Sequence, residues 1–119
     1  MITPEDLLTT SQQIYNKENK TEVDLRNVTR LAYYAIYHKL KKLSEDIDID
    51  DSLISNCGAH EKLIKTLESS NDHKIHAELL RTNRANRVTA DYKLSRNHTP
   101  GESYKTLRAA EKFFKKLQA

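Results

Sequence analysis

The chain has 119 residues, of which 37% are hydrophobic and 31% are charged, and its 20 basic and 17 acidic side chains give a formal charge of +3. This size and balance predict one domain over residues 1–119 with a modest core, and they exclude a second domain. Two glycines and two prolines are too few for the turns of a small all-β protein, so we expect an all-α fold.

The sequence has no run of eighteen apolar residues, and its first residues have neither the basic nor the apolar segment of a signal peptide. We therefore expect no membrane association and a cytoplasmic location. The single cysteine, Cys57, excludes an internal disulfide framework.

The first two predicted helices carry clear start signals. Thr3 as the N-cap and Pro4 at the first helical position predict a helix that ends near residue 17. A longer helix is predicted from Thr21 or Glu22 to about Asp46. One broad face of it is apolar, whereas the opposite face is unusually basic and aromatic, with Arg26, Asn27, Arg30, Tyr33, Tyr34, Tyr37 and His38.

The acidic stretch from Asp46 to Asp51 and the residues up to Gly58 are predicted to form a loop, and Ala59–Leu67 a short helix. A long helix is predicted from about Asp72 to Arg96, and a last one from about Pro100 to Leu117 after a second cap signal at Thr99. Five helices with short connections predict an up-and-down bundle.

Charge is divided unevenly between the two halves of the chain. Residues 1–59 have seven basic and ten acidic side chains, whereas residues 60–119 have thirteen and seven. The second half is therefore the candidate surface for an anionic partner.

Metal sites have little support in the sequence. The stretch that begins at Asp46 resembles the start of a calcium loop, but Asp51 replaces the required glycine and Cys57 the required glutamate. His73 and His76 are three residues apart and lack a third ligand at a suitable spacing. We expect neither a metal nor another cofactor.

Two polar patches on the long helices are the candidate functional residues. The first comprises Arg30, Tyr34, Tyr37 and His38, and the second Arg81, Arg84, Arg87, Asp91, Tyr92, Arg96, Asn97 and His98. Arginine can hold phosphates while tyrosine stacks on unpaired bases, which suits single-stranded RNA. The alternative is structural, with Arg87 and Asp91 as an i,i+4 ion pair and the tyrosines packed inside the bundle.

Three segments in order resemble the HEPN superfamily: Arg30–His38, Gly58–Ile64 and Leu80–Tyr92. The likeness is to small stand-alone prokaryotic members, with an Arg, Tyr-Tyr-Ala, His first motif and an Arg-x-x-Ala-Asp-Tyr second motif. The resemblance implies a HEPN-like helical bundle, frequently a homodimer, in a toxin–antitoxin or phage-defence setting. It also implies metal-independent RNA cleavage by an arginine and a histidine four to six residues later.

The chain departs from that catalytic signature, because Arg87 is followed after four residues by Tyr92 instead of histidine. Arg87, Tyr92, His98 and His38 are our candidate catalytic residues, with histidine as the acid or base and arginine as the group that stabilises the phosphorane. The predicted RNA-binding residues are Arg30, Tyr34, Arg81, Arg84, Arg96 and Asn97.

A non-catalytic function is the alternative. In that version the arginines, tyrosines and Asp91 fix helix packing or a dimer interface, and the protein is an accessory partner, for example of a nucleotidyltransferase antitoxin. Expected partners are thus RNA, a protein antitoxin or nucleotidyltransferase, and a second copy of the chain.

Overall fold

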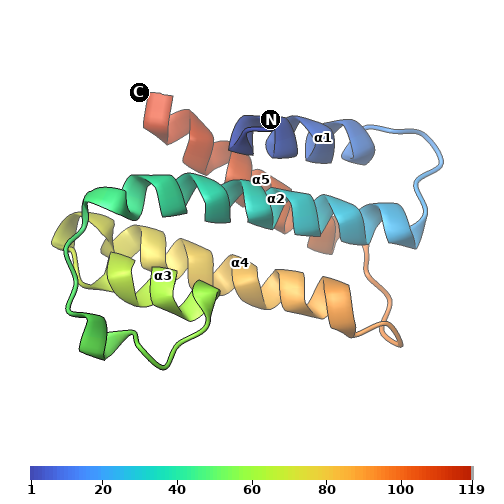
Figure 1. The fold of residues 1–119 in the computed structure, drawn as a ribbon. Coiled ribbons are helices and arrows are strands. Elements are labelled where there is room, and N and C mark those ends of the chain that lie inside the picture. Colours follow the sequence, from blue (N-terminus) through green and yellow to red (C-terminus); the bar gives the residue numbers. More distant parts are fainter. Residues whose placement is uncertain (119) are drawn as a thin grey trace.

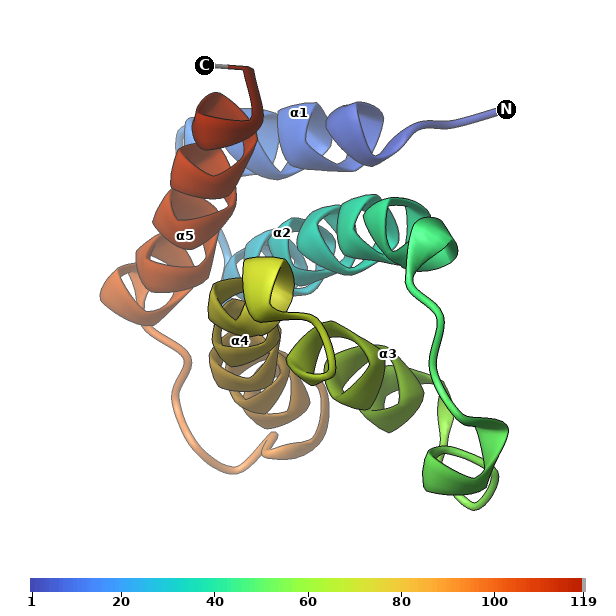
Figure 2. The same cartoon turned by 90° about the vertical axis from the view of Figure 1, so that its left-hand side faces the viewer.

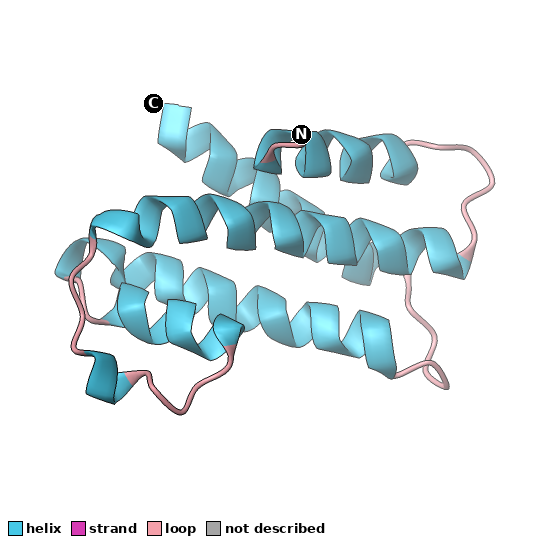
Figure 3. Cartoon of the chain, viewed as in Figure 1, coloured by secondary structure: helices cyan, strands magenta, loops and turns pink. Residues whose placement is uncertain are grey.

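The computed structural model describes residues 1–118, which form an all-α bundle of five helices (Figures 1 and 3). They are α1 (Pro4–Tyr15), α2 (Glu22–Leu43), α3 (Ala59–Glu68), α4 (Lys74–Tyr92) and α5 (Pro100–Gln118). Short 3₁₀ turns at Ser44–Asp46, Asp51–Leu53 and Asn71–His73 lie in the connections. The prediction of an all-α bundle of about five helices is confirmed.

Helix starts follow the sequence signals closely. The Thr3 hydroxyl accepts a hydrogen bond from the Asp6 backbone N–H, and the Asp6 carboxylate accepts one in return from the Thr3 N–H. The same reciprocal pair joins Thr21 to Asp24 at the start of α2. Such pairs satisfy N–H groups that a helix start leaves unpaired, so they fix where each helix begins.

Helix α2 is the central element, and α1, α4 and α5 all pack against it (Figures 1 and 2). Small polar residues of the neighbouring helices bond to its backbone: the Ser11 hydroxyl donates to the Val28 carbonyl, and the Ser103 hydroxyl to the Leu25 carbonyl, each at 2.8 Å. Because both serines are fully buried, the helices approach closely there. The predicted basic and aromatic face of α2 is also partly inside the protein, because Arg26 and Tyr37 are nearly buried and Tyr33 has no exposed surface.

The prediction that the fourth helix reaches Arg96 is wrong, because α4 ends at Tyr92. Arg26 of α2 explains the early end. Its buried guanidinium donates to the carbonyls of Ala90, Lys93 and Arg96. These bonds hold the chain after Tyr92 in a loop that folds around Arg26. If α4 continued as a helix, backbone N–H groups of the helix would bind the same carbonyls instead.

His98 lies at the end of that loop and is 5% exposed. Its Nε2 is 2.8 Å from the Thr29 hydroxyl of α2, and its Nδ1 is 3.8 Å from the carboxylate of Glu102 on α5. Burial lowers the pKa of His98 below its usual value. His98 therefore helps to attach the α4–α5 loop to α2.

Replacing Arg26 tests the role of this loop anchor. In the Arg26→Met variant three carbonyls lose their donor, and we expect the free energy of unfolding to fall by about 2–4 kcal/mol. Urea denaturation followed by circular dichroism measures the change. Arg108→Met on the exposed face of α5 is the matched control and should change stability by less than about 0.5 kcal/mol. Equal stability of both variants would contradict the assignment.

Candidate nucleic-acid interface

Side chains from three helices meet where α2, α3 and α4 adjoin. We call this set the aromatic–arginine cluster; it comprises Tyr33, Tyr34, Tyr37 and His38 of α2, His60 of α3 and Arg87 of α4, together with Arg84, which lies one turn before Arg87 and whose charge acts on His60. The two polar patches that the sequence separates by about fifty residues are thus partly joined in space.

Arg87 is the buried centre of the contact between α2 and α4. Its guanidinium carbon lies 5.4 Å from the ring centre of Tyr33 and 5.6 Å from that of Tyr34, which is the range of a cation–π contact. One nitrogen, Nη1, donates to Asp91 at 3.1 Å. The Nε atom is buried and has no hydrogen-bond partner among residues 1–118.

Asp91 joins the two long helices electrostatically. One of its carboxylate oxygens accepts from Arg87 on its own helix, and the other accepts from Nε of Arg30 on α2 at 2.9 Å. The Arg87–Asp91 ion pair is nearly buried, with 8% and 13% of the two side chains exposed. A carboxylate shared between two arginines leaves net positive charge at this place.

His60 reaches the cluster as the second residue of α3, in the first turn after Gly58 at the N-cap. Its Nδ1 lies 2.6 Å from the hydroxyl of Tyr33, and its ring stacks on the Tyr33 ring with centres 5.6 Å apart. Burial raises the pKa of Tyr33, so the phenol keeps its proton at neutral pH. The hydroxyl can then donate to Nδ1 or accept from a protonated Nδ1, and in the second tautomer Nε2 of His60 is free to accept a proton.

The charges around His60 favour its neutral form. Burial lowers the pKa of His60, and the positive charges of Arg87 and Arg84 lower it further. Burial and the nearby charge of Lys41 also lower the pKa of His38, whose side chain is exposed at the rim. Both imidazoles are therefore mostly unprotonated at neutral pH.

Arg84 differs from the other arginines of α4. It is half-buried, and within the described part of the chain it forms no ion pair or side-chain hydrogen bond. Arg81, one turn earlier, is held by Glu68 of α3 at 3.0 Å and by Glu78. Arg84 is thus the arginine of this region whose donors are free for a ligand.

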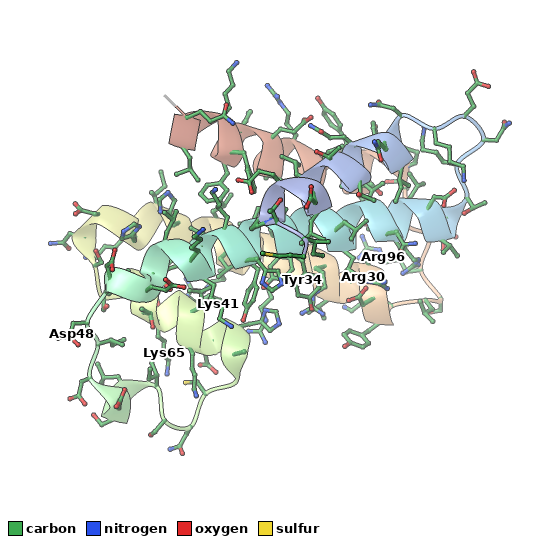
Figure 4. All side chains as sticks on the ribbon, turned by 45° about the horizontal axis from the view of Figure 1, so that its top comes forward. Arg30, Tyr34, Lys41, Asp48, Lys65 and Arg96 are labelled. Carbon is green, nitrogen blue, oxygen red and sulfur yellow. The ribbon has the colours of Figure 1, made fainter. Side chains whose placement is uncertain are left out.

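The remaining predicted site residues lie outside the cluster. Tyr92 is 71% exposed at the end of α4, and Asn97 is exposed in the following loop. Arg96, in the same loop, pairs with Glu102 at 3.3 Å. Figure 4 shows Arg30 and Tyr34 on α2, with Arg96 on the loop beyond the end of α4. His98, as described above, is buried against α2.

Sequence reasoning missed two members of the site, Tyr33 and His60. Tyr33 appeared only as part of the basic and aromatic face of α2, and His60 only as part of the second segment that resembles HEPN proteins. The order of motifs along the chain was a usable signal, but only the packing of α3 shows that His60 points at Tyr33.

The structure contains no evident metal centre in residues 1–118, where no three potential ligands gather. His73 and His76 are adjacent, with their Nδ1 atoms 3.0 Å apart, and His76 also packs edge-on against Phe113. None of the helices in this part of the chain is both apolar and long enough to cross a bilayer.

No protein-family model, curated protein or solved structure matches this chain. Its function is therefore inferred from the chemistry of its own side chains.

The charge environment of His60 can be measured directly. Replacing Arg84 by glutamine removes one of the positive charges that disfavour the imidazolium, so the pKa of His60 should rise toward its usual value of about 6.5. A titration followed by NMR of the histidine ring protons gives this pKa in both proteins.

Arg81→Gln is the matched control, since Arg81 lies one turn away on the same helix but is bound to Glu68 and Glu78. It should leave the titration of His60 unchanged. A pKa of His60 at or above 6.5 in the unmodified protein would contradict the described geometry.

Proposed function

We propose that this chain is a HEPN-like protein of a toxin–antitoxin or phage-defence setting that binds RNA at the aromatic–arginine cluster. The observation that carries the proposal is the half-buried Arg84, which has no partner among residues 1–118 and lies one turn from the cation of Arg87. A phosphate oxygen is a strong acceptor for a guanidinium group, and the donors of Arg84 are accessible to one.

The aromatic residues suit an RNA ligand better than a free inorganic anion. Tyr34 is half-buried and His38 is exposed, and their rings lie 6.0 Å apart on consecutive turns of α2. Exposed ring faces beside a cationic group can stack on unpaired bases while the arginines hold the backbone. This combination supports single-stranded RNA over duplex nucleic acid.

The same cluster contains the groups for RNA cleavage without a metal. In the tautomer whose Nδ1–H donates to the Tyr33 hydroxyl, Nε2 of neutral His60 can take the proton from a ribose 2′-hydroxyl as that oxygen attacks the phosphorus. The leaving 5′-oxygen takes a proton from His38 in its protonated form. The product would be a 2′,3′-cyclic phosphate. Arg84 and Arg87 would stabilise the negative charge of the phosphorane.

This assignment differs from the catalytic residues that we proposed from the sequence alone. Because Tyr92 is exposed away from the cluster and His98 is bonded to Thr29, His60 replaces both as the proposed base. A cytoplasmic location, a homodimer and a protein antitoxin or nucleotidyltransferase partner belong to the same proposal.

A non-catalytic function as an accessory protein is the second candidate, and one observation favours it. The Arg87–Asp91 pair is nearly buried and bridges to Arg30, so part of the cluster holds α2 and α4 together. In that version Arg84 and the tyrosines bind no RNA, and the cluster serves helix packing or a dimer interface.

RNA binding separates the two candidates. With a fluorescent single-stranded RNA, anisotropy titrations should show a dissociation constant about tenfold weaker for Arg84→Gln. Affinity should also depend less steeply on salt: the slope of log affinity against log salt concentration should fall by the amount expected for one lost phosphate contact. Arg81→Gln and Arg108→Gln, which remove the same charge elsewhere, should change the affinity much less. Equal losses in all three variants would assign the binding to diffuse surface charge.

Cleavage is assayed with the same RNA in excess chelator. If the proposed chemistry is correct, His60→Asn abolishes the cyclic phosphate product, and His98→Asn retains it when both variants remain folded. Because the pKa values of His60 and His38 are both lowered, the rate should be highest below pH 6.5. RNA binding without any cleavage would keep the interface and remove the catalytic step.

A further inference from the structure

A groove of about 630 Å³ runs between α4 and α5, on a face of the molecule away from the aromatic–arginine cluster. We call it the α4–α5 groove. Its wall on α5 extends from Tyr104 to Leu117, and its wall on α4 is formed by Ile75, His76 and Leu79. Figure 2 shows α4 and α5 as neighbouring helices.

Apolar side chains that a monomer would normally bury are exposed along this groove. Ile75 is 69% exposed, Tyr104 46% and Leu117 37%. Phe113 is buried between them and contacts His76, so the groove has a solid apolar floor. An exposed apolar surface of this kind with polar edges is typical of a binding surface.

The length of the groove favours a helical ligand. Residues 104 to 117 of α5 cover thirteen steps, which is about 20 Å along the helix axis. A second, shallower depression lined by Thr82 and Asn86 adjoins the groove and shares Ile75 and Leu79 with it. Such a long channel between two helices fits the apolar face of a third helix, which packs about 8–10 Å from its neighbours.

The charge along the groove defines the polar face of that ligand. Lys105, Arg108, Lys112 and Lys116 all line the α5 side. In residues 1–118 the only acidic partner of these four is Glu111, 4.0 Å from Arg108. A ligand with carboxylates along one flank would neutralise this row of cations.

A second copy of the chain is a poorer occupant. If two such grooves faced each other, their lysine rows would meet like charge with like charge, which is unfavourable. We infer that the α4–α5 groove binds an acidic amphipathic helix of a different protein.

This binding surface is independent of the proposed RNA interface. Ile75 and Arg84 are nine positions apart on α4, which places them on opposite sides of the helix at about 100° per residue. The helical ligand and the RNA therefore occupy different faces, and the protein can hold both at once.

The probe is a blocked 18-residue peptide with leucines on one helical face and glutamates along one flank. Isothermal titration calorimetry measures its binding to the full chain. Ile75→Asn and Lys112→Glu should each weaken binding at least tenfold, and added salt should weaken it as well. Leu94→Asn and Lys115→Glu are the matched controls, since both residues are exposed but lie outside the groove, and they should change affinity less than twofold.

Three further ligands complete the test. A peptide with lysines in place of the glutamates should not bind, and neither should a scrambled peptide of the same composition. Equal binding of the lysine peptide, or equal losses in the control variants, would overturn the inference. The inference would also be overturned if no peptide bound but sodium oleate did, with an affinity that depends on Ile75 and Lys112. That result would assign the groove to an acyl chain. Because no RNA is present, failure here is distinct from failure of the RNA proposal.

Discussion

The contact between the Arg87 guanidinium and the rings of Tyr33 and Tyr34 is the constraint on which the functional part of this fold depends. A buried arginine is stable only when its charge is compensated, and here Asp91 and two aromatic faces share that task. Asp91 also binds Arg30, so the same carboxylate fixes α2 against α4. Once these helices are held, the free Arg84 lies in the same cluster as the Tyr33–His60 pair.

The structure divides its polar residues between holding the chain and presenting a surface. Arg26 of α2 and His98 of the α4–α5 loop attach that loop to α2. Arg84 and His38 are left without such ties, near the surface of the cluster. Residue type alone does not distinguish the structural arginines and histidines from those at the surface. The difference is whether another part of the protein already accepts a hydrogen bond from the side chain.

The parts of the structure that local sequence determines were predictable. The pairs Thr3–Asp6 and Thr21–Asp24 mark helix starts because each capping box is complete within four residues. The end of α4 was not predictable, because the carbonyls that stop it bind Arg26, more than sixty residues earlier. His60 was missed as a site residue for the same reason: its partner is distant in sequence, and only tertiary packing joins them. The grouping of Tyr34 with Arg87 was expected from the two motifs, and the structure does place them together.

The most direct test of the account is an NMR titration of the protein with single-stranded RNA, observed at its aromatic, histidine, arginine, lysine and isoleucine side chains. The account predicts that the largest shifts occur at Tyr34, His60 and Arg84, while Ile75 and Phe113 in the α4–α5 groove stay unchanged. Shifts concentrated on the lysines of α5, or no saturable shift in the aromatic–arginine cluster, would contradict it.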